Sequence, residues 1–255
     1  MATTKNTASH AKYYWMEAAG LGGFVLLASL VTIFLEHPEL PVMQTHWKDY
    51  PLLRRVPLGI IMGCYIMLIT VLFGKKSGAQ INPAVTWSFY YLKKISFKDA
   101  ALYTAAQFIG AIAAAQILKH TLGYWFSHPA IDYSVTQPKP QYSSLTALTA
   151  EAIISFVLMF VVLTASASKK WDGRVPLLSG ILIALFIIFE MPFSGMSLNP
   201  ARSTAGDLAA LKFEHLWLYF VSPLAAMLLA SKIFERRYFS SSSADKKDLP
   251  VYPVD

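Results

Sequence analysis

The stretch Ser194–Ser203 reads SGMSLNPARS and places an asparagine, a proline and an arginine within a largely apolar part of the chain. In the other half, Ser77–Ala84 reads SGAQINPA, so a Ser-Gly pair again precedes Asn-Pro-Ala by three residues. Asparagine is a favoured helix N-cap, and proline suits the first helical position because the missing N–H would have no helical acceptor there. Each stretch therefore predicts a short helix that begins at its proline, Pro83 or Pro200.

The rest of the chain is strongly apolar. It has 255 residues, of which 55% are hydrophobic and only 15% are charged, whereas soluble domains carry about 25% charged residues. Helices satisfy their own backbone polar groups in lipid, and a block of roughly 20 apolar residues spans a bilayer core. The sequence therefore predicts an all-α membrane protein with six transmembrane helices, approximately at Tyr13–Leu35, Val56–Phe73, Phe97–Leu118, Leu145–Ser166, Val175–Met191 and His215–Phe234.

The net charge of +7 raises the question of nucleic acid, but no basic face with interleaved aromatic residues is present. The single Cys64 allows no internal disulfide and fits no metal-ligand cluster, so no metal or cofactor is expected. The first twelve residues are polar and the first apolar block is too long for a signal peptide, which predicts no cleavable signal.

Basic residues are distributed unequally along the predicted topology. The short connections Lys93–Lys98 and Lys169–Arg174 lie on the same predicted side as both termini, and this side carries most of the lysines and arginines. Cytoplasmic loops are enriched in such residues, so both termini are expected in the cytoplasm. We expect an integral protein of the plasma membrane. Its excess of basic residues is explained by their concentration on the cytoplasmic side.

The two halves of the chain match each other weakly. Glu17 and Glu151 each lie near the start of the first span of their half, and each half carries Asn-Pro-Ala after its second span. Three spans per half reverse the side of insertion, so the halves form an inverted repeat, the first at about 13–118 and the second at about 145–234. Proteins built in this way place the solute pathway between the repeats, near the membrane midplane.

The two predicted half-helices would enter from opposite faces and meet with their N-termini near the membrane centre. Each N-terminus presents about half a positive charge, and the Asn82 and Asn199 amides would direct N–H donors into the space between them. Irregular backbone at this depth is tolerated where it lines a cavity or is covered by protein. One Asn-Pro-Ala would indicate only a loop-to-helix corner, but a matched pair indicates a pore.

On these motifs the sequence resembles the major intrinsic protein family, the aquaporins and aquaglyceroporins. The resemblance extends from about Tyr13 to Phe234 and includes AAQFIGA at Ala105–Ala111 and the pair Ser222–Pro223. It implies an aquaporin-like bundle of six tilted helices and two re-entrant half-helices, usually assembled as a homotetramer in the lipid bilayer. It also implies a passive channel for water or small neutral solutes (glycerol-, urea- or peroxide-sized) that excludes ions and protons.

The distribution of basic residues and the serine-rich C-terminal stretch predict a cytoplasmic N-terminal tail at 1–12 and a disordered cytoplasmic tail at 235–255. Between them, the resemblance implies a single channel domain at 13–234. It assigns Glu17, Glu151 and Gln107 to the support of the re-entrant loops, and we favour this interpretation over a proton relay. The pore motifs are expected at Asn82, Pro83, Ala84, Asn199, Pro200 and Ala201.

A four-walled constriction is also implied, and counting from the two motifs assigns it to Met62, Ile187, Met196 and Arg202. Arg202 would donate to solute oxygens and raise the barrier for cations, as charged pore walls do. The acids nearest to it in sequence, Glu190 and Asp207, are expected towards the aqueous rim.

The predicted constriction departs from the pattern of many water channels. Ile187 stands where they have histidine and offers no hydrogen bond, and methionine side chains repack around differing shapes. Gln80 stands where the family usually has histidine. These features favour a constriction that tolerates a small neutral solute, whereas Ser203 and Tyr219–Phe220 resemble the water-selective branch. These residues do not decide between water and a larger neutral solute.

Three alternatives compete with a channel. An enzyme would need titratable groups gathered at a cleft, and the six histidines fall in tails, loops or span ends, where surface positions are expected. A coupled transporter would need ion-coupling carboxylates, but a loop-supporting role is available for both membrane glutamates. A closed or gated homologue with a mainly structural or adhesive role remains, because Met62 and Met196 could block the constriction.

Overall fold

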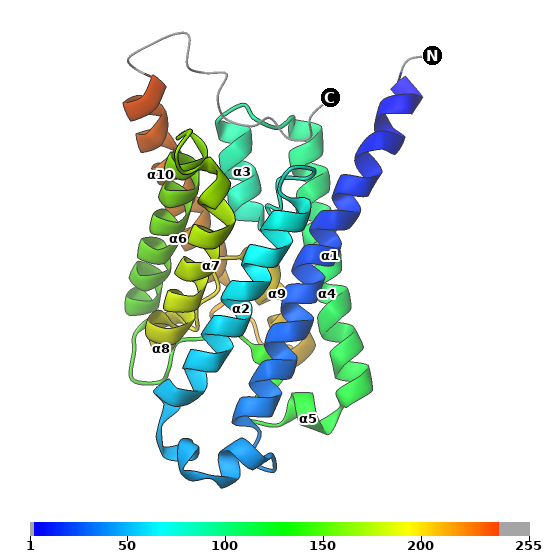
Figure 1. The fold of residues 1–255 in the computed structure, drawn as a ribbon. Coiled ribbons are helices and arrows are strands. Elements are labelled where there is room, and N and C mark those ends of the chain that lie inside the picture. Colours follow the sequence, from blue (N-terminus) through cyan, green and yellow to red (C-terminus); the bar gives the residue numbers. More distant parts are fainter. Residues whose placement is uncertain (1–2, 240–255) are drawn as a thin grey trace.

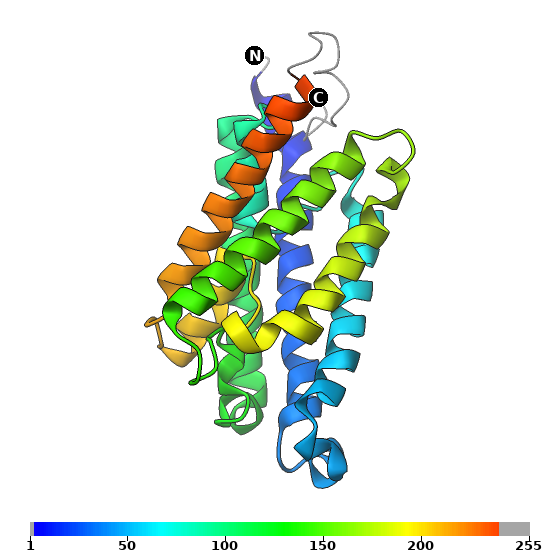
Figure 2. The ribbon, with the colours of Figure 1, turned by 90° about the vertical axis from the view of Figure 1, so that its left-hand side faces the viewer.

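The structure is a computed structural model, and it describes residues 3–239. Six helical stretches in this part of the chain are long and apolar enough to cross a membrane, which confirms the predicted class. Figure 2 shows these spans tilted relative to one another. They are built from α1 (Thr3–Glu36), α2 (Pro51–Phe73), α4 (Phe97–Leu122), α6 (Ser144–Ser166), α10 (Leu216–Phe239) and a fifth span that combines α7 (Val175–Leu185), the π-helical turn η5 (Phe186–Glu190) and α8 (Met191–Ser194).

The first and last helices are longer than their apolar blocks. α1 already begins at Thr3, so most of the expected tail at 1–12 is helical, and α10 continues five residues past Phe234. No proline or glycine interrupts the chain between Thr3 and Lys12, and apolar composition marks where lipid begins rather than where a helix begins. The remainder of the expected C-terminal tail, 240–255, lies outside the described residues. Both described ends lie at the same end of the bundle (Figure 1).

Two short helices lie inside the bundle, and both begin at the predicted prolines. They are α3 (Pro83–Tyr91) and α9 (Pro200–Ala210). The Asn82 side-chain oxygen accepts the Ala84 N–H at 2.9 Å, and the Asn199 oxygen accepts the Ala201 N–H at 3.1 Å. Figure 1 shows α3 near the end that holds both termini and α9 towards the opposite end. The N-caps predicted from the sequence are therefore formed.

Glycines bring the spans into close contact. A Cβ atom at Gly110 of α4 would lie 2.1 Å from the Ala18 carbonyl oxygen of α1, and one at Gly63 of α2 would lie 2.5 Å from the Gly180 oxygen of α7. In lipid, where helices gain little from apolar burial against each other, such contacts between small residues provide van der Waals packing. Of these helices, α4 also packs on both half-helices, α3 and α9.

The connections carry short helical turns: η1 (Pro41–Gln44), η2 (His46–Asp49), α5 (Tyr124–Ser127), η3 (Asp132–Ser134) and η4 (Asp172–Arg174). α5 covers the end of α1, and His37 is fully buried there. Its ring centroid lies 4.4 Å from that of Trp125 and 4.6 Å from that of His128. The expectation of a surface position was wrong for His37, because the fold-back of α5 is a tertiary feature.

Replacing Gly110 by alanine is expected to destabilise the protein by about 1–3 kcal/mol, because the added methyl group meets backbone that cannot move aside. Gly173→Ala is the matched control, since a Cβ atom there meets nothing within 4 Å. The measurement is the thermal unfolding midpoint in detergent. Equal midpoints for both variants would contradict the close α1–α4 contact.

Candidate pore between the two Asn-Pro-Ala motifs

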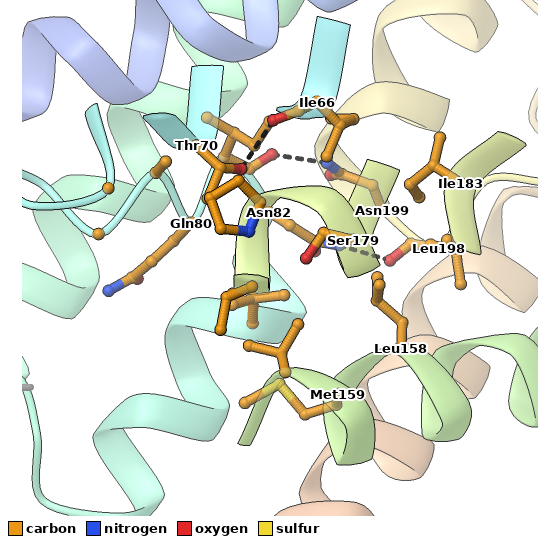
Figure 3. Close-up of a pocket in the computed structure, with 18 of the residues that line it drawn as sticks. Ile66, Thr70, Gln80, Asn82, Leu158, Met159, Ser179, Ile183, Leu198 and Asn199 are labelled. Carbon is orange, nitrogen blue, oxygen red and sulfur yellow. Dashed lines mark hydrogen bonds between the residues drawn. The ribbon is translucent and has the colours of Figure 1, made fainter. Parts of the chain in front are cut away.

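The two motifs are joined directly at their asparagines. Asn82 Nδ2 donates to the Leu198 carbonyl oxygen at 2.7 Å, and Asn199 Nδ2 donates to the Ile81 oxygen, also at 2.7 Å (Figure 3). Each amide therefore uses one N–H to hold the opposite loop. One of the two N–H groups of each amide thus crosses the space between the half-helices, into which these donors were expected to point, and joins the two repeats.

The backbone before each asparagine follows the same unusual path. In both loops the positions that are four, three and one residues before the asparagine have positive φ. Only glycine adopts such angles without cost, and other residues lose about 1–2 kcal/mol each. The loops therefore need support from other segments. The residues with positive φ are Gly78 (93°), Ala79 (46°) and Ile81 (40°) in the first loop, and Gly195 (89°), Met196 (53°) and Leu198 (60°) in the second.

A buried carboxylate supports the first loop. Glu17 accepts the Ser77 hydroxyl at 2.7 Å and the Gln80 N–H at 3.0 Å, and it also accepts the Ile81 N–H. Gln107 donates to the same carboxylate at 2.9 Å and to Thr86 Oγ1 at 3.1 Å. The side chains of Glu17 and Gln107 thus contact the loop and half-helix directly.

Glu151 makes the corresponding contacts in the second loop. It accepts the Ser194 hydroxyl at 2.8 Å, the Ser197 N–H at 2.7 Å and the Leu198 N–H at 2.8 Å. These donors match those of Glu17 position by position. The two halves match only weakly in sequence, but equivalent hydrogen bonds hold their two loops.

Two tyrosines complete the support, and we did not single them out for this role from the sequence. The Tyr103 hydroxyl donates to the Ser77 carbonyl oxygen at 3.0 Å, and the Tyr219 hydroxyl donates to the Ser194 oxygen. The available signal was their spacing, 26 and 25 residues after the two serines. Tyr219 had been considered only as a mark of a family branch.

A cavity of about 1020 Å³ leads to the motifs. Lys75 and Asp172 line it in two connections between spans, and Asn82, Asn199 and Arg202 line it within the bundle. Figure 3 shows Leu158, Met159 and Ile183 among its apolar walls. The cavity therefore brings polar groups of both repeats to one space.

The four residues assigned to the constriction have different surroundings. Met196 and Arg202 line the cavity, whereas Met62 and Ile187 are not among its lining residues. Met62, Ile187 and Met196 belong to one cluster of buried hydrophobic side chains, with exposed fractions of 0%, 5% and 5%. Their joint role as constriction walls stays a prediction. Ile187 lies in the π-helical turn η5, which shifts the register on which the count from Asn199 relied.

Arg202 lies on the first turn of α9, and its Nη1 donates to the Ser134 carbonyl oxygen at 3.3 Å. The two nearby acids are buried, with exposed fractions of 9% for Glu190 and 1% for Asp207. The expectation that they lie at the aqueous rim was therefore wrong. Asp207 lies on a buried face of α9, and Glu190 is the last residue of the π-helical turn. The spacing of residues in the sequence does not reveal either position.

Comparison with known proteins identifies the family. The model of the family described as "Major intrinsic protein" matches residues 11–234, so the chain belongs to the major intrinsic protein family. It is 33% identical to aquaporin-4 of Bos taurus over 184 residues, which cover 71% of this chain and 55% of that protein. It is 29% identical to aquaporin NIP2-2 of Zea mays over 227 residues, 89% of this chain and 75% of that protein.

The fold is also that of a solved structure. The aquaglyceroporin from Plasmodium falciparum matches with a TM-score of 0.75 and 19% identity, over 89% of this chain and 96% of that chain. This match confirms the predicted aquaporin-like architecture. The matched region spans little more than half the length of the aquaporin-4 relatives.

Removal of either loop-supporting carboxylate is expected to destabilise the protein, and Glu→Ala is expected to cost more than Glu→Gln. Glu151→Ala leaves three buried donors without an acceptor, at about 1–3 kcal/mol each, whereas Glu151→Gln keeps one side-chain oxygen. The measurement is expression and thermal stability in detergent, repeated with Glu17. Equal losses for the alanine and glutamine variants would argue against anchoring through hydrogen bonds.

Proposed function

We propose that the protein is a passive channel for water and small neutral solutes that excludes ions and protons. The observation that carries this proposal is the pair of half-helix N-termini, joined through Asn82 and Asn199, which line one cavity together with Arg202. Membership of a family of channels supports it further and speaks against an enzyme.

The ion barrier follows from three positive groups. The N-terminal ends of α3 and α9 each contribute about half a positive charge, and Arg202 adds a full charge. Cations and protons are repelled, while a neutral solute can accept hydrogen bonds from the same donors. A passive pathway therefore needs no ion gradient.

We assign the narrowest point to Met62, Ile187, Met196 and Arg202. Three apolar walls leave Arg202 as the main side-chain donor, so water crossing there loses hydrogen bonds that cost about 1–3 kcal/mol each when unmade. The shared buried cluster of Met62, Ile187 and Met196 supports this assignment. It also favours the alternative, a closed or gated homologue with a mainly structural or adhesive role.

We infer the setting of the channel from composition and family. We propose a plasma-membrane protein. The excess of basic residues on the side of the termini supports cytoplasmic termini, and Lys75 and Asp172, which line the cavity in connections on that side, support a cavity that opens to the cytoplasm. We propose that residues 13–234 form the channel domain and that four copies assemble. On α2, Ile60, Leu68 and Val71 are exposed, and such side chains need lipid or another copy of the chain as a partner.

Reconstitution in proteoliposomes tests the function. Stopped-flow light scattering with water, glycerol, urea and hydrogen peroxide is expected to show permeation of at least one of them with low temperature dependence and without ion gradients. Proton or sodium currents well above those of empty vesicles would refute the proposal. Permeabilities equal to those of empty vesicles for all four would instead support the closed alternative.

Ile187→His tests the constriction. The imidazole adds a hydrogen-bonding group and fills the apolar wall, so we expect the ratio of water to glycerol permeability to rise about fivefold, corresponding to roughly 1 kcal/mol in the barrier. Cys64→Ser is the control, since Cys64 is exposed on α2 and is turned about 200° from Met62. An unchanged ratio for Ile187→His would mean that Ile187 does not line the constriction.

A further inference from the structure

The connection between the repeats contains a left-handed turn without glycine. Asp132, Tyr133 and Ser134 have φ values of 45°, 53° and 55°. A single residue of this kind is uncommon outside glycine, and such conformations persist only where surrounding contacts impose them. The turn closes with hydrogen bonds from Ser134 N to the Ile131 oxygen and from Val135 N to the Asp132 oxygen, both 2.9 Å.

Two lysines contact this turn, one from the segment that follows α9 and one from α4. Lys212, just after α9, donates to both Asp132 carboxylate oxygens at 2.8 and 2.7 Å. Lys119 of α4 lies over the Tyr133 ring at 5.4 Å from its centroid and donates to the Ala209 carbonyl oxygen at 2.7 Å. The Asp132–Lys212 ion pair and the two contacts of Lys119 thus link the turn to the end of α9.

The turn also packs directly on α9. A Cβ atom at Gly206 would lie 3.0 Å from the Ser134 carbonyl oxygen, so the glycine provides the space for the turn. The Thr136 and Ser203 hydroxyls are 2.6 Å apart. The Ser134 carbonyl oxygen, which this packing fixes in place, is the acceptor for Arg202 Nη1.

We propose that Asp132 and Lys212 are positioning residues for Arg202. Their ion pair fixes the left-handed turn, the turn fixes the Ser134 carbonyl, and this carbonyl holds the guanidinium at the side of the pore. The inference rests on the proposed function, in which Arg202 is a wall of the constriction. Loss of the pair frees the turn, lets Arg202 move and widens the passage for solutes larger than water.

The test compares Asp132→Asn and Lys212→Met with the parent chain. Asparagine tolerates left-handed backbone, so Asp132→Asn removes the charge and keeps the turn accessible. Lys139→Met is the matched control, because Lys139 is an exposed lysine of the same connection. The readouts are the glycerol-to-water permeability ratio, the proton leak and the thermal unfolding midpoint of each variant.

We expect both variants to raise the glycerol-to-water ratio and the proton leak severalfold, with Lys139→Met unchanged. The exchanged pair, Asp132→Lys with Lys212→Asp, is expected to restore part of the parent ratio. Arg202→Val is the reference variant, because it removes the arginine wall of the constriction altogether. A merely structural role would lower the unfolding midpoint and leave the ratio intact, and that result would overturn the proposal.

A measurement without conduction separates this proposal from the proposed function. Hydrogen–deuterium exchange of the Val135 amide is expected to be at least severalfold faster in Lys212→Met than in the parent, and unchanged in Lys139→Met. If the parent does not conduct, the proposed function fails and the exchange rates decide whether the ion pair holds the turn. Equal exchange in Lys212→Met and parent overturns the proposal in either case.

Discussion

The structure depends on the hydrogen bonds that two buried glutamates accept from strained loops. Each re-entrant loop has three residues with positive φ, two of them not glycine, and such a backbone would relax without outside acceptors. Glu17 and Glu151 bind the serine hydroxyl and two backbone N–H groups of their loops. Burial of a carboxylate is costly, and here three or more donors offset the cost. The half-helices then begin where the loops end.

Once the loops are held, the asparagines can join the repeats. Asn82 and Asn199 donate to carbonyls of each other's loops, so a displacement of one loop disturbs the other. The surrounding spans must approach closely to hold this arrangement, and glycine contacts such as Gly110 against Ala18 allow it. Helix packing and loop support are therefore coupled, because Ala18 adjoins Glu17 and Gly110 lies one helical turn from Gln107.

Two departures from regular structure lie beside the predicted constriction. The π-helical turn η5 contains Ile187 and ends at the buried Glu190, and the left-handed turn at 132–134 supplies the carbonyl acceptor of Arg202. π-Helical turns and strained residues concentrate at functional sites because they direct side chains that a regular helix could not place. The family match and the solved aquaglyceroporin establish the bundle, whereas these two turns fix the local backbone around Ile187 and Arg202 in this chain.

The sequence alone determined the six spans, both N-caps and the pairing of the two motifs, because each depends on residues adjacent in the chain or on composition over about twenty residues. It also indicated Glu17, Glu151 and Gln107 as loop supports through resemblance. Only the tertiary structure decided that the asparagines bind opposite loops, that Tyr103 and Tyr219 assist, and that His37, Glu190 and Asp207 are buried. The physical reason is that burial, left-handed backbone and pairing of Asp132 with Lys212 depend on contacts between segments far apart in the chain, which no local pattern encodes.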